Sequence, residues 1–186
     1  MINLNFFPFP NLESERLIFR KLIKSDINEV RLLRGNPKTM QFIPRPLVTN
    51  DEEALAHIAM IDETIDTKKG INWVIALKEK PNEMIGIIGH YRIQPENFRA
   101  EIGYMFREDF QGQGYATEAI RRITKYGFEV MNLHSIEAVI DPENYASEKV
   151  LQKNGYVKEA HLIENGFYDG KFLDTVIYSL LKRNFK

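Results

Sequence analysis

The sequence predicts a mixed α/β fold, in which one sheet of about seven strands is flanked by about four helices. Short apolar runs alternate with segments of helical periodicity along the whole chain, and no repeat, low-complexity tract or linker separates them. The three central runs are apolar on both faces, which is typical of strands covered by helices on either side. The length of 186 residues suits a single domain over residues 1–186.

The first part of the chain predicts one strand and two helices. Residues 16–22 alternate between polar and apolar side chains, as in a strand. Ser25 and Asp26 favour the start of a helix that should end near Gly35. Residues 38–50 contain two prolines and predict a loop, after which Asn50 can cap a helix to about residue 67. The apolar face expected on that second helix consists of Leu55, Ile58, Ile61 and Ile65.

The middle of the chain predicts the centre of the sheet and its longest covering helix. Residues 72–78, 84–93 and 100–106 are the three apolar runs, and we expect them to be central strands. Residues 115–131 have helical periodicity, and residues 136–140 predict another strand. The stripe expected to be buried on the helix consists of Ala116, Ile120, Ile123, Gly127 and Val130.

The last part of the chain predicts a short helix and a hairpin. Residues 147–154 should form the helix, because Gly155 stands where a left-handed residue ends one. Residues 156–163 and 171–180 then predict two strands joined by a turn between Gly166 and Gly170.

Composition and charge exclude several classes of function. The chain has 25 basic and 26 acidic residues, with neither the basic excess nor the basic stripe expected of a nucleic-acid binder. No apolar run is long enough for a membrane helix, and the N-terminus lacks the pattern of a secretory signal, so we expect a cytoplasmic protein. The absence of cysteine excludes a cysteine nucleophile and a thiolate zinc site, and the 4 histidines have no metal-binding spacing.

The most informative segment is the glycine-rich turn that opens the long helix, Gln111-Gly112-Gln113-Gly114-Tyr115-Ala116. Two glycines let successive backbone amides face one concavity, and such a nest at a helix N-terminus binds anions. The turn differs from a P-loop, because no lysine follows Gly114. It also differs from the dinucleotide fingerprint, because Thr117 stands where the third small residue belongs. A structural turn without a ligand remains the alternative interpretation.

The turn resembles the pyrophosphate loop of the GNAT N-acetyltransferases, and further motifs follow the order found in that superfamily. The likeness covers about residues 12–182 and is greatest to the branch that acts on ribosomal-protein N-termini, the RimJ/RimL type. It implies a GNAT-like, mostly antiparallel sheet. The motifs besides the turn are residues 12–17 (LESERL), 100–104 (AEIGY), 144–147 (NYAS) and 151–156 (LQKNGY).

The resemblance implies acetyl-CoA as the acetyl donor, with no metal. The coenzyme would lie against a central strand, the glycine turn and the start of the short helix. The residues that the resemblance assigns to this role are Tyr104, Met105, Phe106, Gln111, Gly112, Gln113, Gly114, Tyr115, Ala116, Thr117, Asn144 and Ser147. Arg121, Arg122, Lys125 and Lys153 are further candidates for phosphate contacts, although they also suit a solvated helix face.

Glu101 is the candidate general base. A carboxylate between apolar strand residues is paired, exposed at a cleft, or raised in pKa by desolvation. Attack on a thioester needs a neutral amine, and a carboxylate can take the proton directly or through water. The alternative is a structural ion pair with Arg92 or Arg99, and His90 is a second candidate base.

Ser147 is the candidate proton donor to the departing thiolate. Many GNAT enzymes use a tyrosine seven residues after the asparagine of this motif, but here Leu151 occupies that position. The ribosomal-type branch uses serine at the position of Ser147, while Tyr156 is expected to pack in the sheet. Asn144 would bond the pantetheine arm, and simple helix capping is the alternative.

The acceptor is expected to be a primary amine, either a protein N-terminus or a small amine, attacked directly in a ternary complex. The resemblance places its cleft between residues 40–46 and 163–172. A non-catalytic acyl-CoA sensor and a different phosphate-cofactor enzyme are the competing functions, and a monomer or a homodimer suits the sequence. The candidate wall residues are Phe42, Phe167 and Tyr168, and the candidate acidic ones are Glu164 and Asp169.

Overall fold

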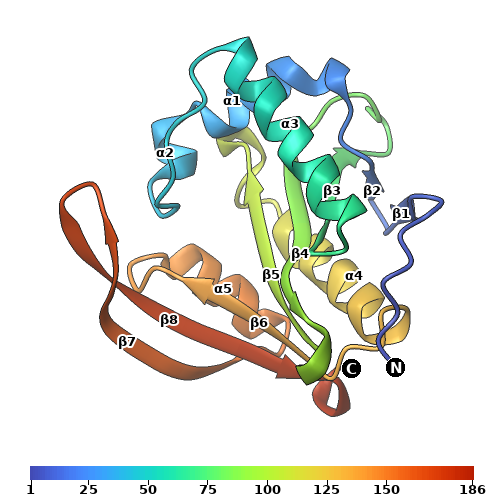
Figure 1. The fold of residues 1–186 in the computed structure, drawn as a ribbon, viewed down its shortest axis with the longest axis vertical. Coiled ribbons are helices and arrows are strands. Elements are labelled where there is room, and N and C mark those ends of the chain that lie inside the picture. Colours follow the sequence, from blue (N-terminus) through green and yellow to red (C-terminus); the bar gives the residue numbers. More distant parts are fainter.

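The computed structural model describes residues 1–186 and has one eight-stranded sheet and five α-helices (Figure 1). The mixed α/β class is as predicted, with one more strand and one more helix than expected. The helices are α1 (Ile27–Arg34), α2 (Pro37–Met40), α3 (Asp51–Asp66), α4 (Tyr115–Glu129) and α5 (Tyr145–Lys153). The strands are β1 (Leu12–Glu13), β2 (Leu17–Arg20), β3 (Ile71–Leu77), β4 (Gly86–Gln94), β5 (Arg99–Phe106), β6 (Ser135–Ile140), β7 (Val157–Tyr168) and β8 (Lys171–Leu181).

The sheet is antiparallel except at one pair of strands. Its order is β1-β2-β3-β4-β5-β6-β8-β7, and only β5 and β6 run parallel. Their register covers Arg99 to Glu101 on β5, after which the two strands separate. Figure 1 shows the result, with β5 continuing upward while β6, β8 and β7 diverge to one side. The edge of β5 beyond Glu101 that faces away from β4 therefore has no partner strand.

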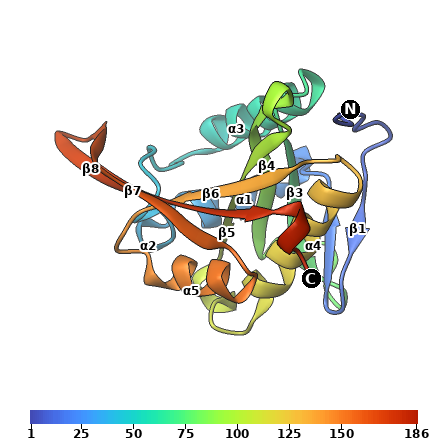
Figure 2. The ribbon, with the colours of Figure 1, turned by 90° about the horizontal axis from the view of Figure 1, so that it is seen from below.

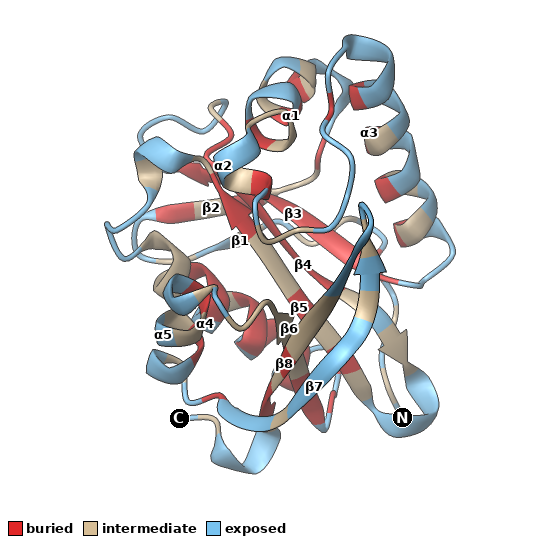
Figure 3. Ribbon diagram, turned by 90° about the vertical axis from the view of Figure 1, so that its left-hand side faces the viewer, coloured by how far each residue is buried: buried red, intermediate tan, exposed pale blue.

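Helices cover both faces of the sheet. α3 lies over one face, and α4 and α5 lie over the other (Figure 2). β3 is buried at every position, because it lies between β2 and β4 and between the two helical layers. Figure 3 shows this burial in the central strands, whereas β7 is mostly exposed at the edge of the sheet. No helix in the structure combines the length and the apolarity needed to cross a bilayer.

Two residues predicted to be buried on helices are instead exposed. Leu55 on α3 is 40% exposed, and Ala54 takes its place in the buried face. Val130 follows the end of α4 and is 45% exposed. Both lie at the margin of an apolar stripe, where the sequence pattern alone does not fix the rotation of the helix.

The loop predicted over residues 38–50 contains the short helix α2. Asn36 begins it, because its Oδ1 accepts from the backbone amides of Lys38 at 2.8 Å and Thr39 at 3.3 Å. Pro37 follows at the first helical position, where its missing N–H costs nothing. The capping residues were present in the sequence, but the later prolines obscured them.

The final hairpin turns later than predicted. β7 continues through Gly166 to Tyr168, and the turn is made by Asp169 and Gly170, with φ of 48° and 77°. This Asp-Gly pair has the two positive φ angles of a tight hairpin turn. The register of this hairpin shifts twice within β7, between Lys158 and Ala160 and between Leu162 and Gly166.

Candidate functional site

The glycine turn before α4 has the backbone shape predicted for it. Gly112 and Gly114 have φ of 74° and 83°, in the left-handed region that L-residues avoid. Gly114 is also the N-cap of α4, so the turn leads directly into the first helical amides. A Cβ at Gly112 would meet nothing within 4 Å, so conformation rather than crowding requires glycine there.

The amides of this turn have no acceptor within the protein. The first amide of the segment with a backbone partner after Gln111 is Glu118, which donates to Gly114 at 3.1 Å, and residues 112–117 have no such partner. Two side chains brace the turn instead. Gln111 Nε2 donates to the carbonyl of Phe106 at 3.0 Å, and Gln113 Nε2 donates to that of Asp109 at 3.0 Å. Free amides at a helix N-terminus form a site for an anion such as a phosphate.

Arg16 is a cation at this turn that sequence reasoning missed. Its Nη1 donates to the carbonyl of Gln113 at 3.1 Å, and its guanidinium lies 4.4 Å from the centroid of the Tyr115 ring. Its Nε is held by Glu118 at 2.7 Å. Arg16 directly precedes β2 and is far from the turn in the sequence, so no local pattern linked it to the turn.

The basic residues predicted beside the turn have other partners. Arg121 donates to the carbonyl of Lys186 at 2.9 Å, and Arg122 donates to that of Glu13 at 2.8 Å. Lys125 lies 3.9 Å from Glu129 on the exposed face of α4. Their interpretation as a solvated or structural helix face is therefore the one that the contacts favour.

The separation of β5 from β6 brings Tyr104 and Ser147 together. The Tyr104 hydroxyl and Ser147 Oγ are 2.5 Å apart, joining the unpaired part of β5 to the first turn of α5. Ser147 is 9% exposed, and burial raises the pKa of Tyr104 to about 12. Tyr104 was expected to lie against the coenzyme, but the contact between its hydroxyl and Ser147 was not predicted from the sequence.

Asn144 caps α5 as one of its two predicted roles requires. Its Oδ1 accepts from the backbone amide of Ser147 at 3.1 Å. Tyr156 packs in the core, 2% exposed, with its hydroxyl 2.8 Å from Thr124 Oγ1. The Tyr156 hydroxyl therefore points into the core, as expected. Tyr104 and Ser147 place their hydroxyls where β5 separates from β6.

Glu101 lies on the opposite face of β5 from Tyr104, because side chains alternate along a strand. Its carboxylate pairs with Arg92 at 2.9 Å, which is one of the two ion pairs considered for it. Arg92 is largely exposed, with 66% of its side chain accessible, so it screens the carboxylate only partly. Burial, with Glu137 nearby on β6, raises the pKa of Glu101 in spite of that pair.

A tyrosine ring covers Gly103 on the same face as Glu101. A Cβ at Gly103 would lie 3.0 Å from Cε2 of Tyr91 on β4, so only glycine leaves room for the ring. The sheet has no bulge at Gly103, since the register shift lies between Tyr91 and Gln94. The Tyr91 hydroxyl is hydrogen-bonded to Asn72 Nδ2 on β3. Aromatic and polar groups therefore line this face beside Glu101.

His90 is not placed to act as a base beside Glu101. It is fully buried on the face covered by α4, with Nε2 3.0 Å from the carbonyl of Ile123. Burial lowers its pKa to about 4.

The other three histidines lie apart from one another. His57 lies on α3, His134 is exposed, and His161 pairs with Asp174 at 2.8 Å on the hairpin. No group of three or more His, Cys, Asp or Glu side chains is placed to hold a metal ion.

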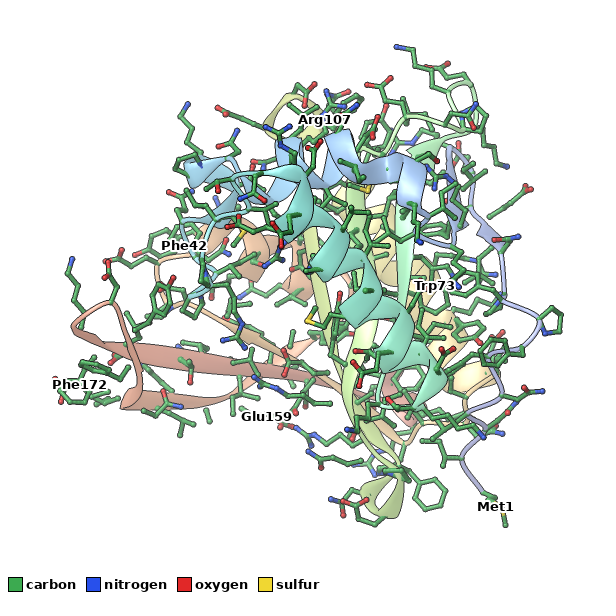
Figure 4. The ribbon with its side chains drawn as sticks, turned by 45° about the horizontal axis from the view of Figure 1, so that its top comes forward. Met1, Phe42, Trp73, Arg107, Glu159 and Phe172 are labelled. Carbon is green, nitrogen blue, oxygen red and sulfur yellow. The ribbon has the colours of Figure 1, made fainter.

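The expected walls of the acceptor cleft are loosely packed. Phe167 and Phe172 contact each other with ring centroids 5.1 Å apart, and each is 65% exposed. Figure 4 shows Phe172 at the far end of the hairpin and Phe42 on the segment after α2, both away from Trp73 in the core. Glu164 and Asp169 are exposed, and the two depressions at α1 include none of these residues.

Comparisons with known proteins agree with this geometry. The sequence model described as "Acetyltransferase (GNAT) domain" matches residues 16–157. The N-acetyltransferase YoaA of Bacillus subtilis is 32% identical over 94% of this chain and 98% of its own length. Spermidine N(1)-acetyltransferase of Vibrio cholerae is 24% identical over 87% of this chain and 91% of its own.

Solved structures show the same fold. A GNAT-family acetyltransferase from Bacillus anthracis has a TM-score of 0.82 and 28% identity, covering 94% of this chain and 99% of its own. RimL, a ribosomal L7/L12 α-N-protein acetyltransferase solved with coenzyme A, has a TM-score of 0.84 and 22% identity, covering 92% and 98%. These matches agree with two features of the structure, the free amides before α4 and the separation of β5 from β6. We conclude that this chain belongs to the GNAT family and is an N-acetyltransferase.

Proposed function

We propose that the chain acts as one domain that transfers the acetyl group of acetyl-CoA to a primary amine by direct attack in a ternary complex. The observation that carries this proposal is the row of free amides at residues 112–117, next to the unpaired edge of β5. The turn suits the pyrophosphate, with Arg16 as a neighbouring cation. Backbone groups of Tyr104, Met105 and Phe106 suit the amides of the pantetheine arm, which would extend the sheet.

In this proposal Glu101 takes the proton of the attacking amine. The reaction forms a C–N bond and breaks the C–S bond of the thioester, so one proton must leave the amine and one must reach the sulfur. A raised pKa makes Glu101 a better proton acceptor while it is ionised. The Arg92 pair keeps enough of the carboxylate charged to act.

Ser147 and Tyr104 supply the second proton in this proposal. When the Tyr104 hydroxyl donates to Ser147 Oγ, the Ser147 proton is free to turn toward the thiolate. The two hydroxyls thus form a short donor chain on one face of β5, while Glu101 acts from the other. In this proposal Ser147 takes the role that a tyrosine has in many GNAT enzymes, because Leu151 occupies the position of that tyrosine here.

The names of similar proteins leave two kinds of acceptor open. RimL acts on a ribosomal-protein N-terminus, and the Vibrio cholerae relative acts on spermidine. We propose a peptide α-amine or a small amine for this chain. A sensor that binds acyl-CoA without catalysis is the second candidate, and the intact Glu101, Tyr104 and Ser147 favour the enzyme.

Calorimetric titration with acetyl-CoA, with ATP and NADH as controls, tests the cofactor. We expect micromolar binding of acetyl-CoA alone. Gly114→Val should weaken binding at least tenfold, because a β-branched residue disfavours the left-handed φ of 83°. Gly170→Val is the matched control, since Gly170 has φ of 77° but lies in the hairpin turn. No binding of acetyl-CoA by the unaltered protein would overturn the proposal.

A further inference from the structure

Arg34 is a half-buried cation without an anionic partner. It ends α1, and its Nε is sealed from solvent with no hydrogen-bond acceptor. Its Nη1 contacts the Met105 sulfur at 3.9 Å, and no ion pair includes it. Burial lowers its pKa, which shows that the surroundings disfavour its charge. An unpaired cation in such a place destabilises the fold, and a bound anion would offset that cost.

The other half-buried arginines show what Arg34 lacks. Each of them donates to a carboxylate or to a backbone carbonyl, as buried guanidinium groups ordinarily do. Their partners are Asp26 for Arg20 at 2.7 Å, Glu137 for Arg99 at 2.6 Å, Glu83 for Arg107 at 3.1 Å, and the Glu13 carbonyl for Arg122 at 2.8 Å. Arg34 is the exception in this set.

The charges nearest to Arg34 add to the positive field. Arg45, on the segment after α2, is close enough to lower the pKa of Arg34. His57 on α3 is neutral, because burial first and the charge of Arg34 second lower its pKa to about 4. The nearby acid Glu101 is held by Arg92. Among these groups only Glu101 would repel an anion, and Arg92 partly offsets its charge.

A second unused donor lies on the same face. Asn72 is 4% exposed, and its side chain bonds the Tyr91 hydroxyl, which the Arg34 charge also influences. With Asn72 Nδ2 as the donor, the Tyr91 O–H and Asn72 Oδ1 are both left without partners. With the amide reversed, Tyr91 donates to the oxygen and Asn72 Nδ2 is left over. Either orientation leaves at least one buried N–H or O–H for a ligand.

These groups lie within reach of the proposed acetyl transfer. Glu101, Gly103 and Met105 are every second residue of β5 and therefore lie on the same face, where the Tyr91 ring covers Gly103. Arg34 contacts Met105, two residues from Gly103 and four from Glu101. At about 3.3 Å per residue, these separations are ~7 and ~13 Å. The far end of an acceptor whose amine lies near Gly103 would therefore reach Arg34.

We propose that Arg34, helped by the Tyr91–Asn72 pair, binds a carboxylate carried by the amine acceptor about 7 Å or more from its amine. The substrate class is then an amino acid or a peptide with an acidic group, and a polyamine is disfavoured. This inference rests on the proposed acetyl transfer, whose donor site lies on the other face of β5.

Three acceptors with the same number of carbon atoms test the inference: 6-aminohexanoate, hexylamine and 1,6-diaminohexane. Their far ends are a carboxylate, a methyl group and a second ammonium group. We expect kcat/KM for 6-aminohexanoate to exceed that for hexylamine by about tenfold or more, with the diamine poorest. Arg34→Gln should reduce the preference to within about twofold, and Arg34→Lys should keep part of it. Equal kcat/KM values in the unaltered enzyme would exclude a free amino acid as the acceptor, and a preference that survives in Arg34→Gln would overturn the inference.

The dipeptide amides Ser-Glu, Ser-Gln and Ser-Lys repeat the comparison for a peptide N-terminus. A carboxylate preference in either series supports the inference and identifies its source as a free amino acid or a peptide. Absence of the preference in both series counts against it.

Binding of hexanoate separates this inference from the proposed function. Calorimetry should detect binding that Arg34→Gln abolishes, while Arg31→Gln keeps it. Arg31 is the matched control, because it lies on the same helix, is exposed and is paired with Asp51 at 2.8 Å. If no amine is acetylated but this pattern holds, the acetyl transfer is wrong and the anion site stands. If amines are acetylated and hexanoate binds equally to both variants, the anion site is wrong.

Discussion

The two faces of β5 have different chemistry. The face toward α4 and α5 contains the parts of the proposed donor site, which are the backbone amides of the glycine turn, an unpaired strand edge and the Tyr104–Ser147 hydroxyls. The other face contains the side chains of the proposed acceptor site, which come from separate elements, Glu101, Tyr91 and Arg34 among them. In this arrangement, different groups of the protein bind the two substrates. A change on one face should thus affect one substrate and spare the other.

The largest expected effect is that of Glu101→Gln. Loss of the base should lower kcat/KM for the amine by about 10²- to 10³-fold at neutral pH. In the proposed mechanism Glu101 acts when it is ionised, and burial raises its pKa. Activity of the unaltered enzyme should therefore fall as the pH drops through that raised pKa, and the variant should lack this decrease. Steady-state kinetics across pH, with calorimetry of acetyl-CoA, measure both.

Glu137→Gln is the control for that prediction. Glu137 lies opposite Glu101 in the register of β6 but is held by Arg99 at 2.6 Å. It should keep kcat/KM within about threefold, a change of less than 1 kcal/mol. Full activity of Glu101→Gln at every pH would show that Glu101 serves only as the partner of Arg92.

A smaller effect is expected for the hydroxyl pair on the donor face. Tyr104→Phe and Ser147→Ala should each lower kcat by roughly ten- to a hundredfold, and the double variant should cost little more, because the two hydroxyls act in one chain. Acetyl-CoA affinity should change little. Single-turnover kinetics would measure the chemical step directly.

Tyr156→Phe is the control for Tyr104→Phe, because it also removes a buried tyrosine hydroxyl that is hydrogen-bonded to another side chain. It should lower stability by about 1 kcal/mol and leave kcat within twofold. If Tyr156→Phe reduced kcat as much as Tyr104→Phe, loss of packing would explain both results.

The smallest expected effect distinguishes the faces through their buried histidines. His57 lies on the acceptor side and His90 on the donor side, and burial lowers both pKa values to about 4. Arg34→Gln should raise the pKa of His57 alone, because the charge of Arg34 contributes only there. NMR titration of the two imidazole rings, down to the lowest pH at which the protein stays folded, gives the measurement, with His90 as internal reference. A parallel shift of both rings would indicate a general loosening of the core instead.

Local patterns were sufficient for most elements of the fold. The boundaries of α3, α4 and β5 follow from caps and periodicity that lie within a few residues of one another. Two elements differed from the prediction because local signals competed. At α2 the later prolines favoured a loop while Asn36 favoured a helix, and in the hairpin Gly166 and Gly170 were both candidates for the turn. The conformation of a short element depends on the sum of several local preferences, and none of them is dominant.

The sequence by itself determined the shape of the glycine turn, because a turn of consecutive free backbone amides leaves a contiguous glycine pattern, Gly112 to Gly114. Only the tertiary structure decided the rest. It brought Arg16 to the turn, Tyr104 to Ser147, Tyr91 over Gly103, and Arg34 to Met105 without a counterion. These contacts join residues far apart in the chain, and their energies depend on burial and charge that exist only after packing.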